Sequence, residues 1–450
     1  MLALRTARAV LALALVVALA LLVLHALPGD GPTWLPGLVP SVLLVLVTGI
    51  GALVSAYAVT NLQGQRRLAR FAALEVVAVA GLALAVLSPH LVLLAVGWTA
   101  GGLAVAALVG HDGGEQSRAA SQAVRLRLLA GDAALWAAVI VVGAGLHTWQ
   151  VAELPGAVAT GSTPWVVLAA VLVVVAGAAR SALVPAHRWL PETAAAPSPV
   201  SALLHAGLAN GVGVLALLLW PVVMASAWAR GLLLVAAVAT VALGTAQLRT
   251  RPDVKGRLAA STSAQMGYLG VQVAIGLPAA VLAHLVGHGL WKASLFLGAG
   301  GTVSRERGTA PVAGAPRSRA LALAGDVALG AGLVLLLAQV PLPWGPALLE
   351  GPAALVPVAV ASLAAVVAVR SARLSGHGRR SAAAGVVLLA VSAYVLALRW
   401  LTPVVDAEVA PATPRWGEPG AVLVLAVVLA LAALVVVGWR VDRAASRGLR

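Results

Sequence analysis

Residues 180–207 read RSALVPAHRWLPETAAAPSPVSALLHAG and lie near the middle of a chain that is otherwise almost continuously apolar. The stretch places two arginines, two histidines, a glutamate and four prolines between runs long enough to cross a membrane. Polar, irregular backbone at membrane depth is tolerated only where protein encloses it or it lines a water-filled cavity. Ionisable side chains there indicate a functional site. The stretch therefore predicts a helical membrane protein built around an interrupted helix.

The composition agrees with this class. Of 450 residues, 61% are hydrophobic and 10% charged, and the mean hydropathy is +1.00; a soluble domain carries about 25% charged residues. The net charge of +15 does not indicate nucleic-acid binding, because the basic residues lie in short loops between apolar runs. The chain has no cysteine, which excludes disulfides and thiolate metal sites. No nucleotide or flavin motif is present, and we expect no cofactor.

About fourteen apolar runs can each cross a hydrocarbon core roughly 30 Å thick. We predict an all-α protein with a single transmembrane domain over residues 1–450. Its N-terminal helices would occupy 1–125, an ion-translocating core 126–300 and C-terminal helices 301–450. The predicted spans are 9–27, 35–59, 71–88, 90–110, 126–147, 163–186, 198–224, 231–248, 257–277, 278–300, 320–340, 352–370, 381–401 and 420–440.

Positive charge alternates from loop to loop along these spans. With the N-terminus in the cytoplasm, most Lys and Arg residues fall in cytoplasmic loops, and only Arg230, Arg399 and Arg415 fall in outer loops. This asymmetry predicts a multi-pass protein of the cell membrane with both termini in the cytoplasm. The first span follows Arg5 and Arg8, and we expect an uncleaved anchor because it is longer than the apolar region of a typical signal peptide.

The prolines at positions 185, 191, 197 and 199 prevent one continuous helix after Arg180. Proline removes a backbone donor and clashes with the preceding turn, so we expect the helix to break and to resume at Ser201 and His205. The freed backbone groups can bind water or ions. Two interpretations of Arg180 stay open: an ion-translocation residue, or an arginine whose head extends to the membrane surface. His205 taken alone would be a structural histidine.

A second constellation lies in AVLAHLVGHGLWKASLFLGAGG, residues 280–301. His284, His288 and Lys292 recur every four residues, so on a helix they share one stripe with steps of roughly 6 Å. Histidine titrates near neutral pH, and water can connect two imidazoles to an amine. The stripe predicts a proton path. The alternatives are a packing stripe, or a zinc site for which no third ligand is obvious; we predict no metal.

Other polar residues inside the predicted spans form a candidate secondary path. They are Ser201, Asn210, Ser261, Gln265, Asp132 and Asp326. Two interpretations of the aspartates are open: counter-ions for Arg180 and Lys292, or carboxylates at the membrane interface. Glu75 lies near the start of the third span.

Both constellations resemble signatures of one family. VPAHRWLPETAAAPSPVSALLHAG is similar to the P-x-H-x-W-L-P-(D/E) … P-(T/S)-P-V-S-A-L-(I/L)-H-A signature of the antiporter-like subunits of respiratory complex I and the Mrp antiporters, and residues 253–300 are similar to their second signature. The resemblance implies a fourteen-helix antiporter-like fold with two inverted five-helix repeats and broken helices. It also implies proton or sodium transport. It places Arg180 at the family's central lysine, His205 at the histidine of the next helix and Lys292 at the bridging lysine.

The chain departs from this family at three places. Thr99 follows Trp98 where the family has a glutamate, Arg180 replaces the central lysine, and no lysine follows Lys292. Because arginine does not deprotonate in proteins, a proton-pumping glutamate–lysine pair is not expected. These departures, with the sequence PETAAAPSPVSALLHAG, resemble the DabB family. Its members are the membrane subunits of two-part inorganic carbon accumulation systems, whose partner DabA resembles a zinc β-carbonic anhydrase.

The resemblance implies a membrane subunit, not itself an enzyme, that conducts protons or sodium ions. It would couple this flow to bicarbonate or CO₂ uptake by a DabA-like, zinc-containing soluble or peripheral partner. One alternative is a proton-translocating subunit of a complex I, Mrp or membrane hydrogenase assembly; another is a structural subunit that conducts nothing. For conduction, we expect protons to enter through His284, His288 and Lys292 and to reach His205 through water, in the field of Arg180.

Overall fold

The computed structural model describes residues 1–25, 35–193, 196–251, 253–302, 334, 361 and 379–409. Among these residues there are helices and no strand, and ten helical segments are long and apolar enough to cross a membrane. The all-α membrane fold is therefore confirmed. The predicted spans at 320–340, 352–370 and 420–440 lie outside the described residues, apart from 334 and 361, so the count of fourteen stays a prediction.

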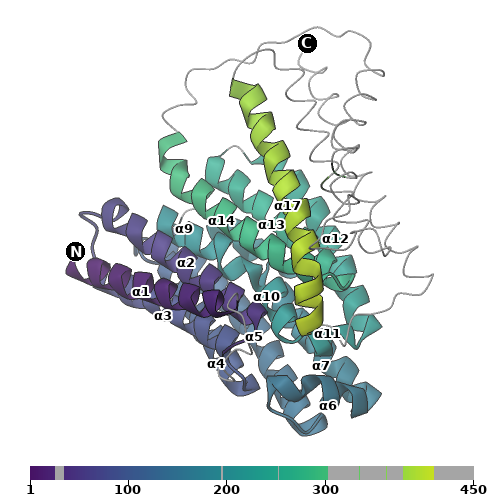
Figure 1. Ribbon diagram of the computed structural model, residues 1–450. Coiled ribbons are helices and arrows are strands. Elements are labelled where there is room, and N and C mark those ends of the chain that lie inside the picture. Colours follow the sequence, from purple (N-terminus) through teal and green to yellow (C-terminus); the bar gives the residue numbers. More distant parts are fainter. Residues whose placement is uncertain are drawn as a thin grey trace, which may run out of the picture. The chain divides into compact units, whose positions relative to one another are not determined.

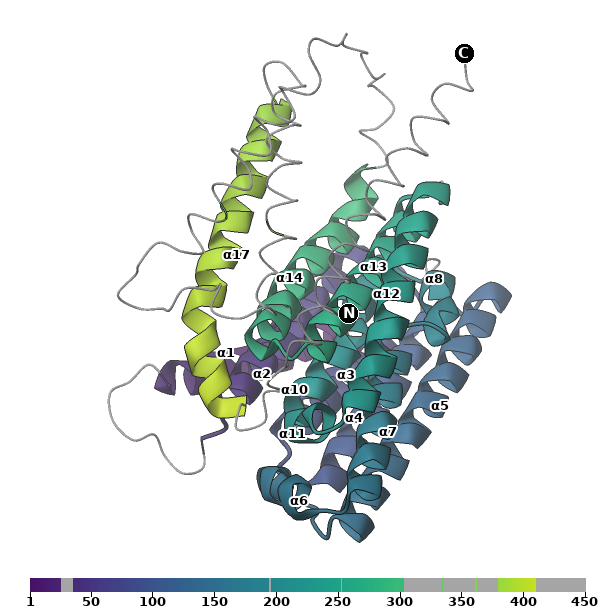
Figure 2. The same cartoon turned by 90° about the vertical axis from the view of Figure 1, so that its right-hand side faces the viewer.

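The chain divides into two compact units, and the first holds residues 1–276, 284–305 and 408–414. All the sites described below lie in this first unit. Its helices up to the break are α1 (Leu2–Leu24), α2 (Leu38–Asn61), α3 (Leu68–Leu87), α4 (Leu91–Val109), α5 (Glu115–Gly145), α6 (Leu154–Thr160) and α7 (Thr163–Arg180). From α1 to α5 each helix packs against the next one along the chain, and α5 packs against α7 (Figures 1 and 2).

After Arg180 the chain continues as short pieces. They are η2 (Ala186–Arg188), α8 (Trp189–Glu192), α9 (Ser198–Ala206), η4 (Leu208–Asn210), α10 (Gly211–Leu218) and α11 (Trp220–Met224). Long helices follow: α12 (Ala227–Thr250), α13 (Val254–Ala274), α14 (Pro278–Thr302) and α17 (Arg379–Val409). The helices α12 and α13 lie side by side in both ribbon views (Figures 1 and 2).

The interrupted span lies at the centre of the first unit. In the most apolar part of Ser198–Leu218, 89% of the residues are buried, whereas none of the other nine described apolar segments exceeds 61%. Helix α9 packs against α2 and α4, and α10 packs against α7 and α13. The structure thus encloses the broken backbone in protein, as a break at membrane depth requires.

Most helix boundaries lie within a few residues of the predicted spans, with two informative exceptions. Helix α5 begins at Glu115, well before the predicted start at 126, because its first turns carry polar residues that a hydropathy criterion rejects but a helix accepts. The span predicted at 198–224 is divided again at Gly207 and at Leu219, so it contains three α-helices. The prolines at 199 and 221 each lie in the first turn of a helix, where no backbone donor is lost.

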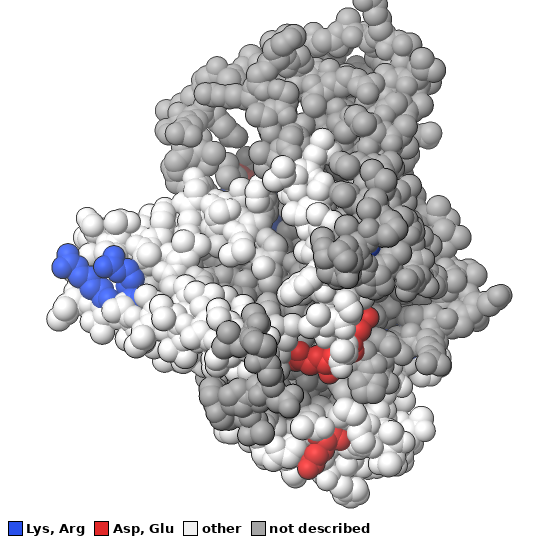
Figure 3. Space-filling model, viewed as in Figure 1, with Lys and Arg blue, Asp and Glu red and all other residues white. Residues whose placement is uncertain are grey.

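The outer surface of the described helices suits lipid. On the face drawn in Figure 3, basic side chains gather near the start of α1, and most of the other described surface is uncharged. Large apolar side chains are exposed along α1, among them Leu13 and Val16. Trp149 and Trp165 are exposed at or beyond helix ends, where amphipathic rings are favoured.

Glycines bring α3 and α4 into backbone contact. A Cβ atom on Gly97 would lie 2.5 Å from the Gly81 carbonyl oxygen, and one on Gly81 would lie 2.7 Å from the Gly101 nitrogen. Gly97 and Gly101 are four residues apart, the spacing of small residues that lets membrane helices approach closely. The pair α3–α4 therefore depends on residues without a side chain.

We expect Gly97→Ala to destabilise the protein, because its Cβ would force the two backbones apart at a cost of about 1–3 kcal/mol. The matched control is Gly231→Ala in α12, where a Cβ would meet no atom within 4 Å. Thermal unfolding in detergent, followed by size-exclusion chromatography, should give a lower melting temperature for Gly97→Ala only. Equal melting temperatures would show that α3 and α4 tolerate a larger separation.

Candidate ion-translocation site

Arg180 is the last residue of α7 and is held by three contacts. Its Nη2 donates to Asp132 Oδ1 at 2.6 Å and to the Trp98 carbonyl oxygen at 3.1 Å. Its Cζ lies 4.3 Å from the centroid of the Trp98 ring, a cation–π distance. Only 2% of Arg180 is exposed. The interpretation of Arg180 as a surface-seeking arginine is therefore wrong, and Asp132 is its counter-ion.

Two glycines make room for this guanidinium. A Cβ atom on Gly102 would lie 2.5 Å from Arg180 Nη1, and one on Gly211 would lie 2.3 Å from Arg180 Cγ. The helix ends at Arg180 because the chain turns immediately afterwards, with Ala182 in the left-handed region at φ 51°. The Ser181 hydroxyl then accepts from the Val212 amide at 2.7 Å, which joins the two sides of the break.

Three histidines meet at the second interruption, between α9 and α10. His288 Nε2 lies 3.2 Å from the carbonyl oxygen of His205, and the His284 and His288 ring centroids are 5.7 Å apart. The His205 ring stacks on Phe296 at 4.3 Å. His205 is fully buried and neither of its ring nitrogens has a hydrogen-bond partner among the described residues. The structure therefore brings together residues that the sequence places about 80 positions apart.

Hydrogen-bond partners determine which histidine nitrogens carry hydrogen. His288 Nε2 faces a carbonyl oxygen, which only accepts, so Nε2 donates and Nδ1 keeps a lone pair. His284 Nδ1 lies 2.8 Å from Gln272 Oε1; with the amide oriented so, Nδ1 donates and Nε2 keeps the lone pair. Each neutral ring thus has one nitrogen that can accept a proton. His288 Nδ1 is buried and has no partner among the described residues.

Lys292 lies two turns beyond His284 on the same helix and is fully buried. Its Nζ donates to Ser261 Oγ at 2.6 Å and to the Leu258 carbonyl oxygen at 3.2 Å. Within the described part of the chain no carboxylate lies within 4 Å of Lys292, since the ion pairs there are Arg180–Asp132 and Arg127–Glu192. In that part of the chain, the amine is therefore held by neutral groups alone.

The remaining predicted residues take different places. The Asn210 amide donates to the Ala206 carbonyl at 2.6 Å, and the Ser201 hydroxyl donates to the Ala196 carbonyl at 3.2 Å, so both satisfy backbone at the break. Gln265 lies on α13 with its Oε1 buried and without a partner among the described residues. Asp326 lies outside the described residues. No group of three potential ligands for a metal occurs among the described residues, so the zinc alternative lacks a third ligand there.

Several partners of these residues are not predictable from the sequence patterns. They are Gln272 and Tyr268 beside His284, Phe296 beside His205, and Lys255, whose Nζ donates to the Ala196 carbonyl. Glu75 is fully buried on α3 and forms no ion pair with a described residue. The only sequence signal for Gln272 is that it is a polar residue inside the apolar span that precedes the stripe.

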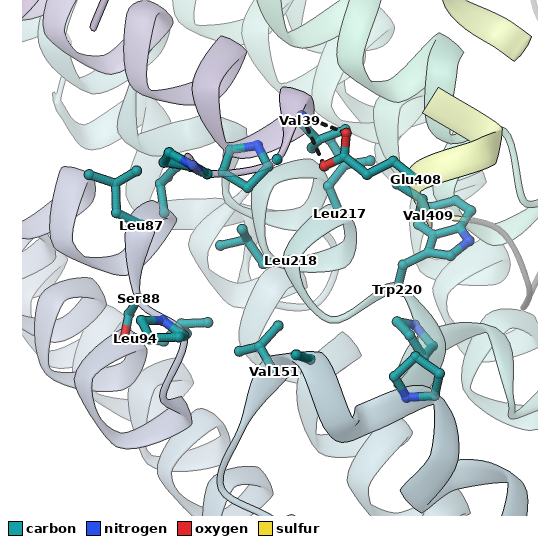
Figure 4. Close-up of a pocket in the computed structure, with 18 residues that line it drawn as sticks. Val39, Leu87, Ser88, Leu94, Val151, Leu217, Leu218, Trp220, Glu408 and Val409 are labelled. Atoms are coloured by element: carbon teal, nitrogen blue, oxygen red, sulfur yellow. Dashed lines mark hydrogen bonds between the residues drawn. The ribbon is translucent and has the colours of Figure 1, made fainter. Parts of the chain in front are cut away.

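A separate pocket of about 480 Å³ lies between residues of α2, α3, α4 and α10. Figure 4 shows its mostly apolar lining, including Leu87, Leu217 and Trp220, and the carboxylate of Glu408 directed at the amide of Val39. The Val39 amide donates to that carboxylate at 3.2 Å. None of the histidines or lysines of the site lines this pocket, so it is distinct from the ion-translocation candidates.

Comparisons with known proteins show the family of the chain. Residues 88–343 match the family described as NADH:quinone oxidoreductase/Mrp antiporter, TM. The probable inorganic carbon transporter subunit DabB of Hydrogenovibrio crunogenus is 34% identical over 253 residues, 55% of this chain and 48% of that protein. A probable K(+)/H(+) antiporter subunit of Rhizobium meliloti is 33% identical over 291 residues, 62% of this chain and 28% of the relative.

The fold is shared with a solved complex. The structure of the Mrp complex from Dietzia has a TM-score of 0.63 at 23% identity and covers 100% of this chain and 57% of that one. This likeness shows the fold alone. The matched region spans about half the length of the DabB proteins of Hydrogenovibrio and Halothiobacillus. Since the family match covers more than half of its residues, the chain belongs to the NADH:quinone oxidoreductase/Mrp antiporter transmembrane family.

Proposed function

We propose that this chain is the cation-conducting membrane subunit of an inorganic carbon uptake complex, and that it performs no catalysis itself. The observation that carries conduction is the file formed by His284, His288 and the broken helix at His205, with Lys292 beside it. Titratable groups are costly inside a membrane and mark proton pathways. Relatives named as inorganic carbon transporter subunits and as a K(+)/H(+) antiporter subunit support transport.

The histidine tautomers support proton transfer in this file. A proton that reaches His284 Nε2 converts that ring to imidazolium, and one water molecule can span the interval to His288 Nδ1 at a ring separation of 5.7 Å. His288 can then release its Nε2 proton to water beside the His205 carbonyl, and that water can pass a proton to an unpartnered ring nitrogen of His205. Lys292 supplies a positive charge whose loss or gain changes the energy of a proton on His288.

The ion pair Arg180–Asp132 has a different role in this proposal. Arginine stays protonated, so the pair cannot exchange a proton with the file. It contributes a fixed dipole beside the start of the interrupted passage, which biases where a mobile cation is most stable. The other polar residues of the site orient the groups of the path or form hydrogen bonds with them. They are Asp132, Ser201, Asn210, Ser261 and Gln265.

The DabB relatives favour coupling to a DabA-like, zinc-containing peripheral partner that forms or captures bicarbonate. The antiporter-like relatives favour the second candidate, a proton-translocating subunit of a complex I, Mrp or hydrogenase assembly. The replacement of both members of the family's glutamate–lysine pair, by Thr99 and Arg180, supports the first candidate. The excess of basic residues in alternate loops supports a cell-membrane location with both termini in the cytoplasm.

Lys292→Met should abolish ion flux, because the residue would keep its volume and lose its charge and donors. We expect a decrease of tenfold or more in flux across proteoliposomes that contain the purified complex, measured with a pH-sensitive dye and with labelled sodium. Arg257→Gln, an exposed residue one turn from Ser261, is the control and should keep its flux. Wild-type flux in Lys292→Met would remove this amine from the mechanism.

Asp132→Asn should destabilise the protein by about 3–5 kcal/mol, because it leaves the Arg180 charge buried without a counter-ion. The double variant Asp132→Leu with Arg180→Met removes both charges and should restore most of the melting temperature. If the pair biases the path, the double variant folds but loses most of its flux. A folded double variant with normal flux would reduce the pair to a structural role.

The partner can be identified by purifying the chain from its native host under mild detergent. For the first candidate we expect a large peripheral subunit that co-purifies with about one zinc per copy, measured by elemental mass spectrometry, consistent with a carbonic-anhydrase-like site. Co-purification of redox or Mrp subunits without zinc would favour the second candidate and contradict the first.

A further inference from the structure

A pocket of about 400 Å³ lies at the opposite ends of α2 and α4 from the pocket in Figure 4, between the α2–α3 and α4–α5 loops. Its lining residues are Gly64, Gln65, Arg66, Arg67, His111, Asp112 and Gly113. None of them belongs to the ion-translocation site. The pocket combines cationic side chains with a buried imidazole at the ends of membrane helices.

His111 is the most informative residue of this pocket. It is only 4% exposed, and neither ring nitrogen has a hydrogen-bond partner among the described residues. Its ring packs edge-on against Phe71 at 5.2 Å, which fixes the imidazole in place. Buried polar nitrogens in native proteins are almost always hydrogen-bonded, so an imidazole with two unused nitrogens beside a pocket indicates a polar ligand or water in that pocket.

Arg66 and Arg67 give the pocket positive charge. Both side chains are exposed, and neither forms an ion pair or hydrogen bond with any residue that the structure describes. A Cβ atom on Gly113 would lie 3.4 Å from Arg67 Nη1, so that guanidinium lies over the backbone of the other loop. Asp112 opposes this charge with a single carboxylate.

A helix N-terminus adjoins the pocket. Helix α3 begins directly after Arg67, and its first intrahelical bond runs from the Phe71 amide to the Arg67 carbonyl. The amides of the first turn before Phe71 therefore have no helical acceptor, and a helix N-terminus attracts anions. Arg67 itself has φ 61°, an uncommon conformation for a residue other than glycine. The N-terminus of α3 thus adjoins the pocket through Arg67, which belongs to both.

We propose that this pocket binds a phosphate-bearing anion. Two guanidinium groups suit the several acceptor oxygens of a phosphate group, and His111 adds a further donor. The adjoining N-terminus of α3 favours negative charge nearby. The volume of about 400 Å³ exceeds that of a phosphate group alone and leaves space for an attached glycerol. The loops lie on the side where basic residues predict the cytoplasm, so the anion comes either from a phosphatidylglycerol headgroup or from free phosphate. This site is independent of the proposed ion conduction.

Native mass spectrometry of the detergent-purified chain tests the proposal with three probes: phosphatidylglycerol, phosphatidylcholine and inorganic phosphate. We expect retained phosphatidylglycerol if the source is lipid, or protection against thermal unfolding by inorganic phosphate if the source is soluble. The double variant Arg66→Gln with Arg67→Gln should weaken that binding by about tenfold or more, since it removes two charge-assisted hydrogen bonds.

Arg118→Gln is the matched control, because Arg118 is exposed near the start of α5 and does not line the pocket. It should bind as the wild type does, and all variants should keep their melting temperature without ligand because these side chains are exposed. Binding that is absent in the wild type for both anionic probes, or unchanged in the double variant, would overturn the proposal.

The pH dependence of phosphatidylglycerol binding gives a second readout. Burial lowers the pKa of His111; Asp112 opposes this shift, and Arg70 and Arg67 add to it. Bound anion favours the imidazolium form, so affinity should increase several-fold between pH 7.5 and 5.5, a range in which the lipid phosphodiester keeps its charge. His111→Gln should remove this increase. Lys255 also lies in the field of Asp112, which opposes the lowering of the Lys255 pKa by burial.

The variant Asp112→Asn distinguishes the contribution of the Asp112 carboxylate to the pH dependence from that of the His111 imidazole. Without the acid, binding should be tighter at both pH values, and the increase toward pH 5.5 should persist. An increase that survives in His111→Gln but disappears in Asp112→Asn would assign the titration to Asp112 and remove His111 from the site.

Discussion

A helix interrupted inside a membrane must find hydrogen-bond partners for its free backbone groups within the protein, and this constraint shapes the centre of the molecule. The carbonyl of His205 accepts from His288, and the carbonyl of Ala206 accepts from Asn210. The amide of Val212 donates to Ser181 on the other side of the break. Water cannot perform these tasks at a lipid-exposed position, which explains why the broken span is the most deeply buried of the described spans.

The same constraint joins structure to the proposed path. His288 satisfies a free carbonyl, and in doing so it presents its other ring nitrogen as a proton acceptor. A residue that only closed the break would not need to be titratable, since an asparagine does this at position 210. Packing and hydrogen bonding alone therefore do not explain why position 288 is a histidine. A titratable residue at the break is the reason to connect the break with proton transfer.

Charge is arranged in two ways in this structure. Arg180 has a carboxylate, a carbonyl and an aromatic ring as partners, so its positive charge is compensated and permanent. Among the described residues, Lys292 has a hydroxyl and a carbonyl, so its charge is solvated by dipoles alone. Loss of a proton leaves an uncompensated aspartate in the first case and only neutral groups in the second. For this reason the second cluster, and not the first, is suited to a change of protonation.

The sequence predicts the spans well where their apolar runs are continuous, as for α2 and α4, because length and hydropathy alone determine them. It also predicts the interruption after Arg180, since proline geometry is local. It fails at the start of α5 and at the second interruption at Gly207, where no proline marks the break. The partners of the site were the least predictable part. The sequence offers two aspartates as partners for Arg180 and Lys292, and no sequence pattern selects Gln272 as a partner of His284, because contacts between helices depend on rotation about each helix axis.

The sequence does not predict the partners of the site because they lie on other helices. Helix periodicity places His284, His288 and Lys292 on one stripe, but the direction of that stripe is set by neighbours on α9 and α13. The Ser261 hydroxyl and the His205 carbonyl come from spans that the sequence treats separately. A stripe of titratable residues facing lipid would have the same sequence pattern as this one. Burial of His288 against the interrupted helix and of Lys292 against α13 distinguishes the two cases, and it favours a path through the protein.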